Sequence, residues 1–197
     1  MEKLLLYIKH NLKFLWRIIE FFNSLLLNIV HRKKITTIKQ NYSDYIDTNN
    51  GFQFRLITSE DLDRLYSLLS KLDKHYVKYF NPHAFDRESL KYVLKSNNFL
   101  TFGYFHNKKL VGYFMLRLFA NSKAFTSRVV DSDFSGRGIG KDMAKIMYRM
   151  ANELDWGVFA TISEENIASL KTHNYKVVKK LPNGYILIKF NTKDTNW

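Results

Sequence analysis

Apolar residues recur every three or four positions along the first part of the chain, which predicts a long amphipathic helix. This row, which we call the apolar seam, consists of Leu5, Ile8, Leu12, Leu15, Ile19, Phe22, Leu26 and Ile29. Further large apolar side chains lie beside the seam, so the apolar side is wide, while polar residues return at every seventh position from Lys3 to His31. A basic cluster at residues 31–34 follows the helix.

Several roles are open for this helix. Lys13, Arg17 and Glu20 interrupt every window of roughly 20 residues, which argues against a membrane-spanning helix, and no small-residue cleavage site follows it, which argues against a signal peptide. The wide apolar side and basic flank fit a helix lying on an anionic membrane surface. The heptad spacing fits packing on the core or on a second subunit equally well. We therefore expect an appended helix at residues 1–40 and a polar, turn-rich linker at 41–51.

After residue 51 the pattern changes to short alternating strands and short helices, which predicts one domain of mixed α/β (α+β) type at residues 52–190, with a tail at 191–197. The expected order is strand, two helices, three strands, helix, strand, helix and a terminal hairpin. Strands are expected at 52–58, 99–105, 110–119, 124–130, 158–162, 175–181 and 185–190. Helices are expected at 59–69, 87–95 and 164–173, and from residue 139 to near Gly157. Short turns make the middle three strands an antiparallel meander.

A glycine-rich loop joins the strand that ends at residue 130 to the next helix. It contains three glycines separated by single residues and two cations, namely Gly136, Arg137, Gly138, Gly140 and Lys141. The first N–H groups of a helix have no partners and the helix dipole adds positive charge there, so such a turn can bind a phosphate. Glycine lets the backbone approach the anion closely. The spacing is neither that of a dinucleotide-binding fingerprint nor that of a Walker loop.

Residues 129–141 resemble the acetyl-CoA pyrophosphate loop of the GNAT superfamily of N-acetyltransferases. In that family the pattern Arg/Gln-x-x-Gly-x-Gly/Ala follows a strand, and Ser135 stands here where the Arg or Gln usually lies. The order of elements over residues 52–190 is also that of the GNAT fold, a mixed and mostly antiparallel sheet flanked by helices. The resemblance implies an acyltransferase that uses acetyl-CoA as acyl donor.

The resemblance also implies which residues contact the cofactor. In the family the fourth and fifth strands splay apart and the pantetheine arm pairs with the fourth, which here implies backbone contacts from Arg128, Val129 and Val130. The loop would contribute Ser135, Gly136, Arg137, Gly138, Ile139, Gly140 and Lys141. The second family signature, Asn-x-x-Ser, is present as Asn166 and Ser169. It implies that Asn166 bonds the pantetheine or helps to form the acyl site, although the same pattern also occurs at an ordinary capped helix.

The catalytic side chains are less clearly marked. His173 stands where the family often has a tyrosine that protonates the leaving thiolate, and it is either that general acid or the last residue of a shortened helix. A base or a water chain must deprotonate the acceptor ammonium group. The candidates are Glu164 and Asp131 beside the splayed strands, and His83 in the loop between the first two helices. Aromatic residues in that loop, Tyr76, Tyr79, Phe80 and Phe85, suit stacking on an acceptor or plain packing.

Composition limits the other classes of function. The 197 residues include no cysteine, which excludes disulfides, thiolate metal sites and a cysteine nucleophile, and no metal-ligand spacing is present. The net charge of +13 attracts both CoA and anionic surfaces. No basic helix or aromatic–basic motif indicates a nucleic acid partner.

These patterns together predict a cytoplasmic, metal-independent N-acetyltransferase. A primary amine of a small-molecule or envelope-precursor acceptor would attack acetyl-CoA directly, with backbone N–H groups holding the cofactor and its carbonyl. Residues 1–30 would provide a peripheral contact with the inner face of the membrane or form a homo-oligomer. The alternative is a non-catalytic module that binds acyl-CoA, a membrane or a partner on the same fold.

Overall fold

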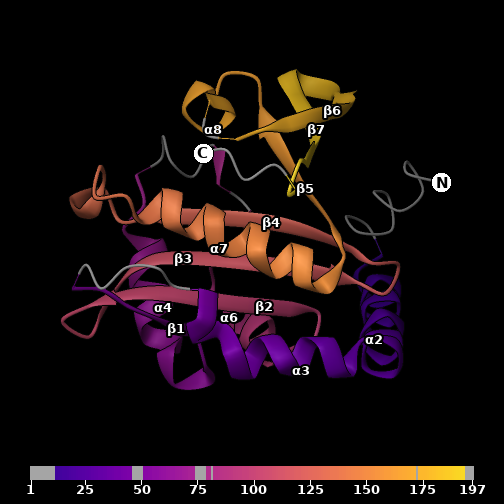
Figure 1. Ribbon diagram of the computed structural model, residues 1–197. Helices are drawn as coiled ribbons and strands as arrows, with labels where there is room; N and C mark the ends of the chain where they lie inside the picture. The colour runs from indigo at the N-terminus through magenta and orange to yellow at the C-terminus, as the bar shows by residue number, and fades with distance from the viewer. Residues whose placement is uncertain (1–11, 46–50, 74–78, 81, 172, 194–197) are drawn as a thin grey trace.

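The computed structural model describes residues 12–45, 51–73, 79–80, 82–171 and 173–193. Within these residues seven strands form one sheet in the order β1-β2-β3-β4-β5-β7-β6 (Figure 1). The strands are β1 (Gln53–Leu56), β2 (Phe99–His106), β3 (Lys109–Phe119), β4 (Lys123–Val130), β5 (Gly157–Ser163), β6 (Tyr175–Leu181) and β7 (Tyr185–Phe190). Neighbouring strands are antiparallel except β4 and β5, which are parallel. The predicted mixed, mostly antiparallel sheet is therefore confirmed.

Helices cover both faces of this sheet and divide the apolar core in two (Figure 1). One core is formed with α7 (Ile139–Leu154) and α3 (Arg32–Asn41), and the other with α4 (Leu62–Ser70) and α6 (Arg87–Lys95). Because both faces are covered, β2 and β3 are almost continuously buried instead of alternating. The rings of Phe54, Phe102 and Phe114 stack across β1, β2 and β3 with centroids 5.4 and 5.3 Å apart, which adds cross-strand stabilisation.

The one parallel pair is short. Only Lys123–Phe125 of β4 pair with Gly157–Phe159 of β5, whereas β4 pairs with β3 along its whole length. Beyond Phe125 the two strands no longer pair, and within the described structure residues 126–130 pair with β3 only. The sheet therefore has an open strand edge in its middle, directly before the glycine loop.

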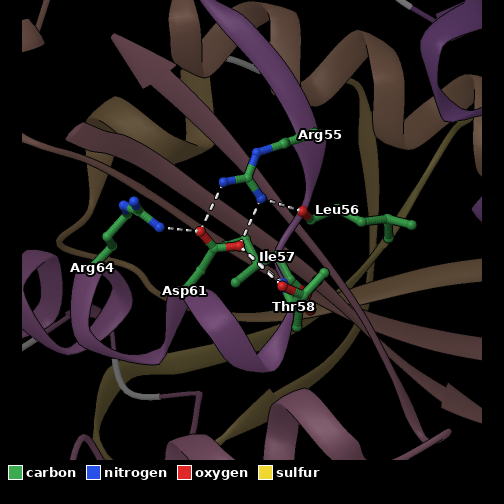
Figure 2. Close-up of polar contacts among 7 residues, drawn as sticks. Arg55, Leu56, Ile57, Thr58, Asp61 and Arg64 are labelled. Carbon is green, nitrogen blue, oxygen red and sulfur yellow. Dashed lines mark hydrogen bonds and ion pairs between the residues drawn. The ribbon is translucent and has the colours of Figure 1, made fainter. Parts of the chain in front are cut away.

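A buried carboxylate fixes β1 to the turn that begins α4. Asp61 is 1% exposed and accepts two hydrogen bonds from Arg55, at 2.6 and 2.7 Å, and one from Arg64 at 2.9 Å (Figure 2). The backbone N–H of Thr58 donates to the same carboxylate at 3.1 Å. Burial alone would raise the pKa of Asp61, but the Arg55 hydrogen bonds, the Thr58 amide and the Arg64 hydrogen bond lower it to about 2. Arg55 also lies over the ring of Phe105, 3.8 Å from its centroid.

The predicted N-terminal helix is present as two segments, α2 (Lys13–Val30) and α3. The break is at His31, whose buried ring bonds the carbonyl of Ala120 at 3.0 Å and packs edge-on against Trp156. Leu27, Ile35 and Ile38 enter the core on the α7 side. Among the described helices, none combines the length and the apolarity that a membrane crossing requires. The first two seam positions, Leu5 and Ile8, lie outside the described residues.

Candidate functional site

The glycine loop has the backbone geometry that only glycine adopts readily. Gly136 and Gly138 have φ angles of +75° and +84°, and a Cβ built on either would meet no heavy atom within 4 Å. The conformation therefore favours glycine, and the space in front of both residues is open. Before them, Asp131 directly follows β4, and its side chain accepts a hydrogen bond from the Asp133 N–H at 3.1 Å at the start of the short turn η3 (Ser132–Phe134).

The loop also presents a run of free backbone donors. Within the described chain, the N–H groups of residues 136–140 make no hydrogen bond, whereas those of Lys141 and Asp142 bond the carbonyl of Gly138 at 2.9 and 3.0 Å and start α7. Five successive unbonded N–H groups, with glycines in the left-handed conformation, form an anion-binding concavity at a helix N-terminus. The guanidinium of Arg137 lies over the Phe134 ring, 4.8 Å from its centroid, and adds positive charge.

The open edge of β4 continues from this loop. Val129 is buried in the core on the α4 side, while Val130 packs against the core on the α7 side. The Thr126 hydroxyl is buried and has no hydrogen-bond partner in the described structure. A long ligand with its phosphates on residues 136–140 can thus extend along residues 126–130, where backbone groups lack a strand partner on the β5 side.

A partly buried polar cluster lies on the α7 side of the open edge. Arg128 donates to Nε2 of His173, and Nδ1 of His173 lies 2.6 Å from the Tyr148 hydroxyl. An arginine can only donate, so Nε2 accepts and the imidazole proton is on Nδ1, directed to Tyr148. Burial, with the Arg128 charge, lowers the pKa of His173 to about 3, and burial lowers the pKa of Arg128 to about 10. His173 is therefore neutral at physiological pH.

A second histidine lies on the opposite side of the sheet. His83 Nε2 is 3.0 Å from the hydroxyl of Tyr113, which is fully buried, and Nδ1 is 2.9 Å from the carbonyl of Ala84. The carbonyl can only accept, so Nδ1 carries the proton and Nε2 accepts from Tyr113. Burial lowers the pKa of His83, more than the Ala84 carbonyl raises it. His83 and His173 are on opposite faces of the sheet and the structure does not bring them together.

The predicted acidic residues have different surroundings. Glu164 directly follows β5; its carboxylate is about half exposed and lies 3.6 Å from Lys180 Nζ. Asp131 is paired with Lys109 at 2.8 Å. The Tyr79 hydroxyl donates to Glu165 at 3.3 Å, so the aromatic loop before α6 reaches the end of β5. Tyr76 lies outside the described residues.

The Asn-x-x-Ser segment forms a helix start. The Asn166 side chain accepts a hydrogen bond from the Ser169 N–H at 3.1 Å, which caps the five-residue helix α8 (Ile167–Lys171). This geometry is that of an ordinary cap, and contacts of Asn166 with a cofactor stay a prediction, as do those of Arg128, Val129, Val130 and the loop.

Comparison with known proteins decides the family. Residues 52–174, more than half of the chain, match the family model described as the acetyltransferase (GNAT) domain. The chain belongs to the GNAT acetyltransferase family. The predicted resemblance and fold are thereby confirmed. No curated protein matches the chain in sequence.

Solved GNAT structures have the same fold. The GNAT domain of S. lividans PAT superimposes with a TM-score of 0.62 at 15% identity, covering 71% of this chain and 89% of that one. PaiA N-acetyltransferase from Thermoplasma acidophilum, solved with coenzyme A, gives a TM-score of 0.58 at 16% identity and covers 71% and 98%. An N-acetyltransferase from Staphylococcus aureus gives 0.55 at 15% identity and covers 73% and 99%. At these identities the likeness establishes the fold.

The residues present fit acyl-CoA, the acyl donor of the GNAT family. The N–H groups of residues 136–140 match a pyrophosphate, the open φ-positive glycines leave it room, and the open β4 edge can pair with the amide groups of a pantetheine arm. Sequence reasoning missed Tyr148 and Tyr113, the partners of the two histidines. Both lie within apolar runs that read as core, and only their contacts with distant histidines distinguish them.

Proposed function

We propose that the protein transfers an acetyl group from acetyl-CoA to a primary amine of a small-molecule or envelope-precursor acceptor. The observation that carries this proposal is the run of unbonded N–H groups at residues 136–140, placed directly after the open edge of β4. An anion site alone would suit many ligands. An anion site joined to a free strand edge suits a ligand with a pyrophosphate at one end and an amide-containing arm at the other.

Acetyl-CoA supplies the acyl group as a reactive thioester. In the proposed reaction the neutral amine attacks the thioester carbonyl carbon, the new C–N bond forms and the C–S bond breaks. CoA leaves as a thiolate that takes up a proton, and the nitrogen releases one. The loop and the β4 edge hold the donor in place, and backbone N–H groups hold the polarised carbonyl oxygen.

We propose Glu164 as the group that takes the amine proton, directly or through water. It follows β5 where β4 and β5 have parted, and its partner Lys180 is an exposed side chain that a substrate can displace. His83 is a weaker base, because its Nε2 lone pair already accepts from Tyr113. His173 as general acid faces a similar limit, because its Nδ1 proton is directed to Tyr148.

Both histidines are engaged in internal hydrogen bonds. This observation favours a second candidate function, a non-catalytic module that binds acyl-CoA. Release of free thiol from acetyl-CoA against a panel of amines separates the two. Because the protein contains no cysteine, a thiol reagent reports CoA alone. The proposal predicts amine-dependent thiol release, which Gly138→Glu abolishes. Acetyl-CoA binding without turnover on any amine would instead support the binding module.

A further inference from the structure

Helix α2 presents its apolar side to solvent. All described positions of the apolar seam, namely Leu12, Leu15, Ile19, Phe22, Leu26 and Ile29, are at least 36% exposed. Three apolar side chains beside the seam are exposed as well, with Phe14 at 73%, Phe21 at 65% and Leu25 at 45%. The described part of the seam therefore does not pack on the core of this protein. A continuous apolar surface of this kind marks a contact site for a protein or a membrane.

Polar side chains of α2, together with the buried Leu27, make the contacts with the domain, at the end of the sheet where α2 stands in Figure 1. Glu20 accepts from Arg117 and from Tyr92, both at 2.7 Å. Asn23 donates to the Asn98 side chain at 3.0 Å and to the Leu118 carbonyl at 2.9 Å, and accepts from the Ala120 N–H at 3.0 Å. These directional bonds fix the rotation of the helix, so that its apolar side is held outward.

The exposed charges around this surface are positive. Residues 12–41 include six Lys or Arg residues and a single acidic residue, Glu20, and Glu20 is already paired with Arg117 on the domain side. Arg17, Arg32 and Lys33 are exposed. An apolar helix side with cations near its edge and no free acid is the pattern of a helix that lies on an anionic lipid surface.

A hollow beside the end of α2 is also lined by positively charged side chains. Its volume is about 490 Å³, and two basic residues, Arg32 and Lys39, line it together with Asn28, Ile35, Thr36 and Asn97. Burial lowers the pKa of Lys39 because it disfavours the charged ammonium group. An anion bound in the hollow would stabilise that charge. Two cations and no acid in one hollow suit the phosphate of a lipid headgroup.

We propose that α2 docks the protein on an anionic membrane surface, with its apolar side in the headgroup region and with Arg32 and Lys39 on lipid phosphates. A second copy fits less well. A symmetric dimer through α2 would place this cationic surface against itself, with no unpaired acid on either helix to compensate. The proposal is independent of the proposed acyl transfer, since it concerns a surface on another part of the chain.

The test is co-sedimentation of the full chain with lipid vesicles. One set contains phosphatidylcholine only, and the other contains in addition about a third of phosphatidylglycerol to supply negative charge. We expect binding to the anionic vesicles to exceed binding to the neutral ones by roughly tenfold or more, and to weaken in high salt. The double variant Phe21→Ser/Ile29→Ser should lose at least about tenfold in binding.

Two controls keep the result interpretable. The variant Val177→Ser/Val178→Ser removes exposed apolar side chains from β6 instead and should bind vesicles like the wild type. Arg32→Gln/Lys39→Gln should lose the preference for anionic vesicles, whereas Lys91→Gln/Lys176→Gln should keep it. Absence of vesicle binding, equal binding to both vesicle types, or a dimer in size-exclusion chromatography that the Phe21→Ser/Ile29→Ser variant dissolves would overturn the proposal.

Discussion

Replacement of Asp61 by Asn removes one negative charge from a buried network without changing the size of the side chain. In the wild type this carboxylate accepts five hydrogen bonds, from Arg55 twice, from Arg64 once, and from the N–H and the hydroxyl of Thr58. An amide can accept with its oxygen only, and its NH₂ group would face the Arg55 guanidinium. We therefore expect Asp61→Asn to destabilise the fold.

The size of the effect follows from the pKa of Asp61, which the network lowers from its ordinary value of 3.8 to about 2. At about 1.4 kcal/mol per pKa unit, the ionised carboxylate contributes roughly 2–3 kcal/mol at neutral pH. Because the folded pKa is below the unfolded one, this contribution is present above about pH 4 and is lost as the pH falls towards 2. The difference between wild type and variant should decrease over the same interval.

Urea unfolding followed by circular dichroism, at a series of pH values, measures this difference. Asp63→Asn is the matched control, because Asp63 lies two residues further on, in the first turn of α4, and pairs with Arg87, but its side chain is 78% exposed. An exposed pair contributes at most about 1 kcal/mol. If Asp61→Asn cost no more than Asp63→Asn, or if its effect did not depend on pH, the account of this network would be wrong.

Three further predictions concern other parts of the structure. Gly112→Ala should destabilise the fold by about 1–3 kcal/mol in thermal unfolding, because the new Cβ would overlap Met143 Cε. An unchanged unfolding midpoint would show that the core between β3 and α7 is not tightly packed. Because the pKa of His173 is lowered to about 3, the free energy of unfolding should fall as the pH decreases from about 6.5 towards 3. His173→Gln should remove that part of the pH dependence, and an identical profile would contradict the neutral state of His173. Glu164→Gln should reduce kcat/KM by about 10²-fold with unchanged CoA affinity, and full activity would exclude Glu164 as the base.

The sequence was sufficient for features that depend on local pattern. Strands, helices and the glycine loop follow from spacing and from the conformational freedom of glycine, and the φ angles of Gly136 and Gly138 agree with it. The buried, almost continuous β2 and β3 could be assigned because their runs are short and are bounded by turns.

The orientation of α2 could not be predicted in this way. Its seam is the most regular apolar row in the chain, but the contact of Glu20 with Arg117 joins residues far apart in sequence, as does that of Asn23 with Asn98. Periodicity shows that a helix has an apolar side and does not show what covers that side. The same limit applies to His173, whose neutral state depends on Arg128 and Tyr148.

The measurement that tests the central claim most directly is calorimetric titration of CoA into the wild type and into Gly138→Glu. Gly184→Glu is the control, because Gly184 also has a positive φ of +72° and no atom within 4 Å of a built Cβ, but lies in the turn between β6 and β7. The two substitutions should cause similar backbone strain. We predict that Gly138→Glu weakens CoA binding by at least about tenfold, while Gly184→Glu binds CoA like the wild type. Equal CoA affinity in Gly138→Glu and the wild type would contradict the assignment of the loop as the pyrophosphate site.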